Sequence, residues 1–485
     1  MFKTLKNAWG IVDLKKKMLF TLLIVVLYRL GAQIPVPFIG DLGGLETMMN
    51  GNILQYLDII SGQALGNATL FALGVSPYIT ASIVVQLLTI AIPVLEKWSK
   101  EGDEGKKKIN VLTRIITIVL ALITAIGYVM MLNTSGSLIF SETTLKANFF
   151  HYAIIVLCYC AGAAIVMWLA EKINESGIGN GISIILFANI IAGFATTVST
   201  LWSAIFTNTS TSMFGGFDWV GLLVAIAFII IFLGLILLIV WMSDAERRIP
   251  IQYAKRVVGR KMYGGQNTNL PLKVNMTGVM PIIFANSIVT IPATIAMLLS
   301  NTGWGWVNSM NAGIKGWGLK GVENISGLIE MFFGHSSWAY LVVFMVLLVA
   351  FAYFYVAISF NPVEVANNIK NNGGAIPGIR SGRPTVEFIK KVLYRITLVG
   401  ALLVVFIACF PMLINNILSI DGIQNAITAS KTVEGLARSA TTYTALFSTL
   451  AFSGSSLMIV VGVALETVRE LEAQMSLRNY KGFLD

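Results

Sequence analysis

The chain has 485 residues, of which 56% are hydrophobic and only 12% carry a formal charge. Typical soluble domains are about 25% charged, and a mean hydropathy of +0.78 leaves too little polar surface to cover several globules. A soluble multidomain enzyme and a disordered polymer are both excluded. The composition therefore indicates an integral membrane protein, which we predict to be all-α.

The membrane spans are predicted from runs of residues that lack charge, because about 20 apolar helical residues cross the hydrocarbon core. An opening span at 18–39 is interrupted by Arg29, which is either a snorkelling or internally paired structural residue or a residue that acts in transport. The runs 59–95 and 176–217 are too long for one span, so each should hold a helix and a re-entrant or interfacial piece. Seven further runs bring the total to ten helices: 115–132, 152–170, 219–242, 276–299, 338–360, 396–418 and 439–465.

Basic residues predict the orientation of these spans. Of the 34 lysines and arginines, 28 fall in the N-terminal segment, in alternate loops and in the C-terminal segment. By the positive-inside rule, both termini face the cytoplasm. The opposite loops hold only Lys146, Lys315, Lys320, Lys431 and Arg438.

The spans divide into two halves of five at a polar external linker, 207–216. An odd number of spans in each half gives the halves opposite orientations, which is the arrangement of an inverted repeat. We predict an N-terminal half at 1–206, a C-terminal half at 217–466 with long cytosolic loops at 243–275 and 361–395, and a cytosolic tail at 467–485.

The sequence offers no specific catalytic constellation. Its three cysteines, Cys158, Cys160 and Cys409, lie in apolar runs, and the two histidines are far apart, so a disulfide framework or zinc site is not expected. The glycine-rich stretch 177–181 precedes a membrane helix without a preceding strand, so it is not a nucleotide site. We predict no enzyme activity, cofactor or metal, and any work must be driven by a partner or a gradient.

Two features in or beside the predicted spans need an explanation. The segment 52–72 is amphipathic and too polar to span alone, so it is either a mobile plug in a funnel or an external interfacial helix. Several bulky aliphatic residues lie close to glycine or proline on four different helices. They could converge on a constriction that excludes water, or they could serve ordinary helix packing. These residues are Val75, Ile79, Ile182, Leu186, Ile283 and Ile459.

The two long cytosolic loops are basic. Such loops bind anionic lipid headgroups or dock an acidic or RNA-containing partner, although orientation alone also accounts for their charge. The candidate contact residues are Arg247, Arg248, Lys255, Arg256 and Arg380.

At these same features the sequence resembles the SecY family, whose members are central subunits of the bacterial Sec protein translocase. Residues Phe71–Ser82 are similar to the second helix of that family, and 177–183 are similar to the start of its fifth helix. Further ordered matches fall at 101–109, 252–256, 270–275 and 377–380.

The resemblance implies ten helices in two inverted halves around an hourglass pore in the cell membrane. It puts the pore ring on the six aliphatic residues and the lateral gate between the second and seventh helices, marked by Thr80, Ile83, Asn286 and Ile291. The plug at about 52–72 would include Leu54, Leu57, Ile60, Gly62 and Leu65. Secretory clients with signal sequences, SecE-like and SecG-like small subunits, a SecA-type motor ATPase and the ribosome are the implied partners.

Such a channel would pass unfolded polypeptides across the membrane and release apolar segments sideways into lipid. Two alternatives stay open. A secondary transporter for a small solute is also built from inverted repeats, but it needs a polar midplane. An accessory SecY homologue restricted in its substrates is the other alternative, because Val75 and Leu186 replace isoleucines of the ring and the external loops at 300–337 and 419–438 are long.

Overall fold

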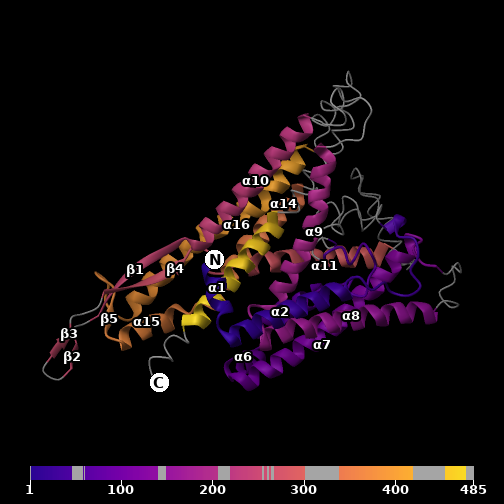
Figure 1. The fold of residues 1–485 in the computed structure, drawn as a ribbon. Helices are drawn as coiled ribbons and strands as arrows, with labels where there is room; N and C mark the ends of the chain where they lie inside the picture. Colours follow the sequence, from indigo (N-terminus) through magenta and orange to yellow (C-terminus); the bar gives the residue numbers. More distant parts are fainter. Residues whose placement is uncertain are drawn as a thin grey trace, which may run out of the picture.

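The structure is a computed structural model, drawn in Figure 1. It describes residues 2–45, 58, 61–139, 149–205, 219–253, 256–258, 261–263, 267–300, 338–418 and 454–476. The predicted linker at 207–216 and nearly all of the two long external loops lie outside this part of the chain.

Seven labelled helices make up the N-terminal half. Of the predicted spans, α2 is the first, α5 the second, and α7, α8 and α9 the next three. Their bounds are α1 Phe2–Trp9, α2 Val12–Gly31, α5 Ser76–Ala91, α6 Pro93–Lys100, α7 Asp103–Thr134, α8 Phe149–Ser176 and α9 Gly181–Ile205.

The predicted opening span, 18–39, is wrong at its C-terminal end, because α2 ends at Gly31. Two prolines follow, Pro35 and Pro37, and a residue before proline avoids the helical region. The chain instead turns at Ala32 and forms an isolated bridge from Pro35 to Thr69.

The described part of the run 59–95 consists mainly of turns followed by two helices, α5 and α6. Residues 62–75 are mostly turns, and α5 then begins with Pro77 in its first turn, where a missing amide hydrogen has no cost. At Ile92 the backbone is extended, and α6 leaves α5 at an angle of 102°.

The C-terminal half contains five labelled helices and one further helical segment, 454–476, which covers the end of the predicted tenth span. The labelled helices are α10 Trp219–Asp244, α11 Met280–Ser300, α14 Trp338–Ser359, α15 Pro362–Asn371 and α16 Arg383–Leu418. Among the described residues, five helices are long and apolar enough to cross a membrane, or six if α5 and α6 count as one span.

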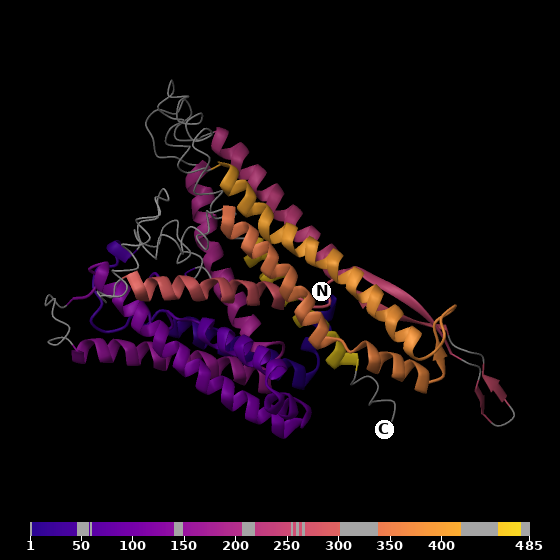
Figure 2. The same cartoon turned by 180° about the vertical axis from the view of Figure 1, so that it is seen from behind.

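The helices are arranged in two groups, which both views show (Figures 1 and 2). One group contains α2, α7 and α8, and the other contains α10, α14 and α16. Helix α11 belongs to the C-terminal half in sequence, but it packs against α5 and α7 as well as against α14. The two halves are therefore joined through α11, and also through contacts of α9 with α10.

A small sheet packs against α15 and α16, and the all-α prediction did not include it. Strand β1 (Glu246–Tyr253) pairs antiparallel with β4 (Asn267–Lys273) on one edge and with β5 (Gly374–Ala375) on the other. A second hairpin joins β2 (Arg256–Val258) to β3 (Lys261–Tyr263). The chain is mostly helical, but its two long basic loops form one sheet together.

Candidate functional site

The six aliphatic residues singled out in the sequence, here called the central set, come together in one hydrophobic core. Five of them are at most 5% exposed, and Ile182 is partly buried against the same core. They come from α5 and its N-cap, from α9, from α11 and from the segment 454–476. The set thus joins four helical segments from both halves of the chain.

Glycine and proline determine how these helices begin. At the start of α9, a Cβ atom on Gly181 would lie 2.0 Å from the Ala170 carbonyl oxygen of α8, so only glycine allows this close approach. The Gly181 amide donates to the Asn174 side chain at 2.7 Å, and the Ile182 amide donates to Asn180 at 3.1 Å. These contacts fix the first turn of α9, which carries Ile182 and Leu186.

The predicted gate helices, α5 and α11, pack against each other. On α5, Ile83 is buried and the Thr80 hydroxyl donates to its own helix at the Ser76 carbonyl, 3.0 Å away. On α11, Asn286 is 5% exposed, and neither atom of its side-chain amide has a hydrogen-bond partner among the described residues. Ile291 on the same helix is half-buried.

Only the end of the predicted plug falls within the described residues. Leu54, Leu57 and Ile60 lie outside them, while Gly62 and Leu65 belong to the turns at 61–75. Leu65 packs in a second core, between α7 and α8, rather than with the central set.

Side chains from three helices hold the backbone of these turns. Tyr128 of α7 donates to the Leu65 carbonyl, Tyr159 of α8 donates to the Ala68 carbonyl at 3.3 Å, and Arg29 of α2 donates to the Gly62 carbonyl at 3.4 Å. Sequence reasoning missed both tyrosines, because each lies more than sixty residues from its partner and no local pattern marks it.

The basic loop residues lie on the sheet and beside it. Arg247 and Arg248 are exposed on β1, and Arg380 is exposed just before α16. Lys255 lies outside the described residues, and Arg256 belongs to β2. The β1–β5 pairing brings the two loops together, and we call this unit, 246–273 with 361–396, the loop platform.

Comparison with known proteins identifies the family. The SecY family profile matches residues 69–468. The protein translocase subunit SecY of Streptomyces scabiei is 39% identical over 495 residues, which cover all of both chains. The chain belongs to the SecY family. It is accordingly a multi-pass membrane protein and a subunit of a protein translocation channel, not an enzyme.

Solved structures share the fold of this SecY family member at low sequence identity. One is described as the structure of a protein conducting channel, with a TM-score of 0.59, 18% identity, and coverage of 95% of this chain and 92% of that one. Another is canine Sec61 in a ribosome–channel complex from the endoplasmic reticulum, with a TM-score of 0.55, 16% identity and the same coverage.

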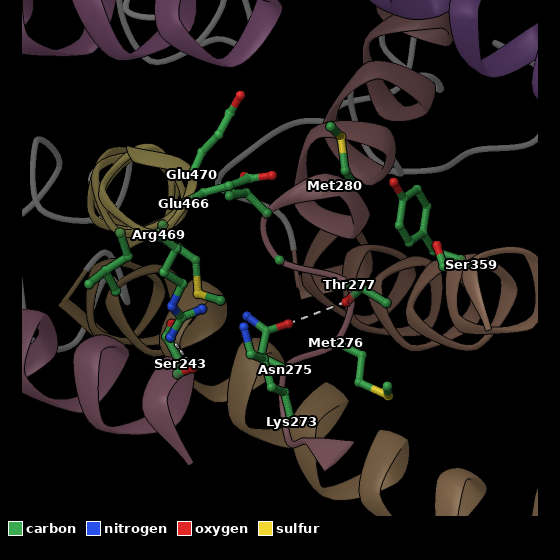
Figure 3. Close-up of a pocket in the computed structure, with 16 residues that line it drawn as sticks. Ser243, Lys273, Asn275, Met276, Thr277, Met280, Ser359, Glu466, Arg469 and Glu470 are labelled. Carbon is green, nitrogen blue, oxygen red and sulfur yellow. Dashed lines mark hydrogen bonds between the residues drawn. The ribbon is translucent and has the colours of Figure 1, made fainter. Parts of the chain in front are cut away.

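A cavity of about 510 Å³ lies beside the central set of this SecY family chain (Figure 3). Met280, one turn before Ile283, and Met458, which precedes Ile459, both line it. Lys273, Glu466, Arg469 and Glu470 add charged groups. Arg469 donates to the Ser243 carbonyl and to the Asp244 carboxylate, each at 2.7 Å. The cavity thus adjoins both ionic groups and the neighbours of the central set.

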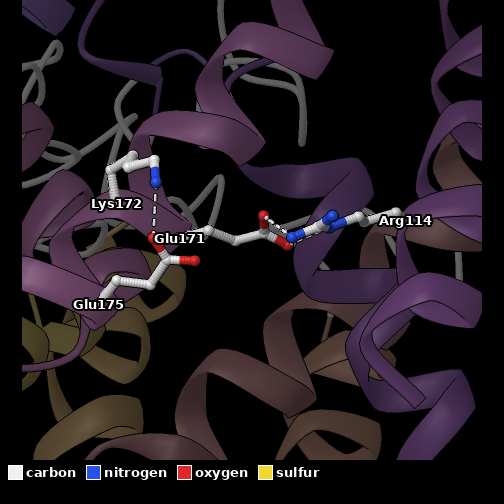
Figure 4. Close-up of polar contacts among 4 residues, drawn as sticks. All are labelled: Arg114, Glu171, Lys172 and Glu175. Carbon is white, nitrogen blue, oxygen red and sulfur yellow. Dashed lines mark hydrogen bonds and ion pairs between the residues drawn. The ribbon is translucent and has the colours of Figure 1, made fainter. Parts of the chain in front are cut away.

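An ion pair also joins α7 to α8 (Figure 4). Arg114 of α7 reaches both carboxylate oxygens of Glu171 of α8, at 2.9 and 2.7 Å. Further along α8, Lys172 donates to Glu175 at 2.6 Å. Among the described residues, no group of three or more His, Cys, Asp or Glu side chains is arranged to hold a metal ion.

Proposed function

We propose that the central set forms the closed constriction of a polypeptide pore. The observation that carries this proposal is the packing of six aliphatic side chains, five of them buried, from four helical segments in one core. Aliphatic side chains exclude water and ions when they pack together, and they deform around an extended chain without forming hydrogen bonds that would retain it. Unfolded secretory polypeptides of any sequence could therefore pass.

The seam between α5 and α11 is the proposed lateral gate, and Thr80, Ile83, Asn286 and Ile291 are its local residues. Asn286 supports this assignment, because burying an amide without a partner costs about 1–3 kcal/mol in the closed state. Opening the seam would relieve that cost. An apolar client segment could then leave sideways into lipid, where its burial is favourable.

Several features of the proposal concern the surroundings of the pore. We place the channel in the cytoplasmic membrane with both termini in the cytoplasm and with inverted halves at 1–206 and 217–466. The plug at 52–72 would cover the pore. The cavity beside Met280 and Met458 would form part of its cytosolic entrance.

The loop platform is the proposed docking surface for the ribosome or for a SecA-type motor, and for anionic lipids. The exposed Arg247, Arg248 and Arg380 support this role, as does the canine Sec61 structure, which was determined in a ribosome–channel complex. SecE-like and SecG-like subunits complete the proposed assembly.

Crosslinking of a stalled client tests the pore. Single cysteines replace Val75 and Ile283, and a secretory chain with a thiol-reactive probe is arrested during transport. We expect both cysteines to crosslink to the chain. A cysteine at Leu237, which is 71% exposed on α10 and faces away from the core, is the control and should stay unlinked. Crosslinking at Leu237 but not at Val75 or Ile283 would refute the pore assignment.

A further inference from the structure

Arg29 is a charged residue within the first predicted span, where solubility in water does not explain the presence of a charge. A charge at membrane depth is costly, so it is retained where partners hold it. The Arg29 side chain points into the protein and donates from Nη1 to the Gly62 carbonyl and to Asn189 Oδ1, each at 3.4 Å. One guanidinium therefore joins three elements: α2, the turns at 61–75 and α9.

The side chain of Asn189, which accepts from Arg29, is itself held by a hydrogen bond. Asn189 and Tyr28 are both fully buried, and the Asn189 amide donates to the Tyr28 hydroxyl at 2.9 Å. This second bond returns from α9 to α2 next to Arg29. It orients the Asn189 amide with its oxygen toward the guanidinium, so the three side chains form one connected group.

The contact with Arg29 depends on the backbone conformation of Gly62 and on its lack of a side chain. Its φ is +69°, a conformation that favours glycine, and a Cβ atom there would lie 2.5 Å from Arg29 Nη1 and 3.0 Å from Asn189 Oδ1. Any side chain at this position would displace the guanidinium. The close approach and the backbone conformation thus both require glycine.

The connected group lies between two parts of the central set. Asn189 follows Leu186 by three residues on α9, so the two are neighbours on that helix. The turns that begin at Ser61 end at Val75, the N-cap of α5. Arg29 therefore links the segment leading to Val75 with the helix that carries Ile182 and Leu186.

We propose that Arg29 is a positioning residue for the closed channel, which pins the plug segment at Gly62 to α9 and so sets how readily the pore opens. This inference rests on the proposed pore function. Movement of 61–75 away from α9 breaks at least one of the two Arg29 bonds. Both bonds are long for hydrogen bonds, so the link is weak enough to open in each transport cycle.

The test measures ion leak through the purified protein reconstituted in lipid vesicles without a client. In Arg29→Gln, we expect leak to rise several-fold and by at most about tenfold, because a hydrogen bond of normal length to a charged group is worth about tenfold or more and these two are longer. Arg29→Lys keeps the charge and should give a smaller rise. Arg114→Gln is the control, since it also removes an arginine that joins two helices, and it should leave the leak unchanged.

A second pair of variants serves if Arg29→Gln fails to assemble. Gly62→Ala should raise leak by displacing Arg29. Gly136→Ala imposes a similar backbone strain, at φ +71°, but its Cβ meets nothing within 4 Å, so it should not raise leak. In the double variant of Arg29→Gln and Gly62→Ala, the rise should not exceed that of the larger single variant, because both break the same contact.

Two results overturn the inference: leak in folded Arg29→Gln equal to that of Arg114→Gln, or leak in Gly62→Ala equal to that of Gly136→Ala. Measuring Ile283→Asn alongside separates this failure from failure of the pore assignment. If Ile283→Asn raises the leak and the Arg29 and Gly62 variants do not, the pore assignment is supported and the proposed role of Arg29 is refuted. If Ile283→Asn does not raise the leak either, the pore assignment itself is wrong.

Discussion

The central set and the loop platform both depend on small aliphatic clusters, but they use them in opposite ways. In the platform, Ile249 and Ile251 of β1 pack with Leu272, Ile369 and Ile389, and the exposed charges lie on the outside. The buried side chains stabilise the platform, while the charged groups that can contact a partner lie on its outside.

In the central set, the buried residues are themselves the proposed working surface. Val75, Leu186 and Ile283 come from separate helices that meet only through side chains. In the platform, strand pairing fixes β1 against β4 and β5, whereas among the described residues no strand pairing joins the helices of the central set. If the central set parts as proposed, burial alone does not distinguish a gate from a rigid core, and the backbone connections around the buried side chains do.

The largest effect that can test this comparison is expected for Ile283→Asn. An unpaired amide in the closed core costs about 1–3 kcal/mol, and it regains water when the pore opens. We expect a rise in ion conductance of roughly tenfold or more in planar bilayers, together with acceptance of poorer signal sequences in an export assay. Ile459→Asn should behave in the same way.

The matched control for this change is Leu348→Asn. Leu348 is 1% exposed in the same core, but it lies on α14 and outside the central set. Its replacement should lower stability without raising conductance. Equal conductance in the two variants would show that the seal depends on core packing in general, and the comparison would break down.

An intermediate effect is expected on the platform, for Arg380→Glu. Reversing an exposed charge at a docking surface places like charges against an acidic or phosphate-bearing partner. Motor-driven export into vesicles should fall several-fold, while conductance and folding stay as in the parent protein.

Arg383→Glu controls for the reversal of charge. Arg383 is 91% exposed at the start of α16 and pairs with Glu387. It should reduce export less than Arg380→Glu does. If the two variants lose export equally, the platform acts by its net charge and Arg380 has no special role.

The smallest effect is expected for Glu246→Ala, which removes the 2.7 Å ion pair with Arg248 on the outer side of β1. Exposed ion pairs contribute at most about 1 kcal/mol to stability. The midpoint of thermal unfolding in detergent should therefore shift by only a few degrees. A larger shift would mean that the exposed charges also stabilise the platform, so that its buried side chains would not be its only support.

Much of the fold was predictable from hydropathy, because lipid requires apolar runs and backbone bonds satisfied within each span. The helix ends were less predictable. Helix α7 begins at Asp103 and α16 at Arg383, each well before the apolar run that predicts it. A charged helical turn is stable in water but not in lipid. The end of an apolar run therefore marks the edge of the membrane and not the end of the helix.

The contacts between side chains of the candidate site were even harder to predict from the sequence than the helix ends. The six residues of the central set were singled out beside glycine and proline, but only the family resemblance favoured a pore over ordinary packing. Ile249 and Ile251 alternate with exposed residues on β1, but Pro250 between them argues against a central strand, so this signal was weak. By contrast, nothing near Tyr128 or Asn189 in the sequence indicates the distant partner that each one holds.

The pairing of β1 with β5 also bears on the order in which the protein is made. Strand β4 follows β1 closely, so that hairpin can form early, but Gly374 is synthesised only after α11 and α14. Residues Ile369 and Ile389 of the platform core arrive equally late. A nascent copy of this chain therefore completes its proposed docking surface only after α14 has been synthesised.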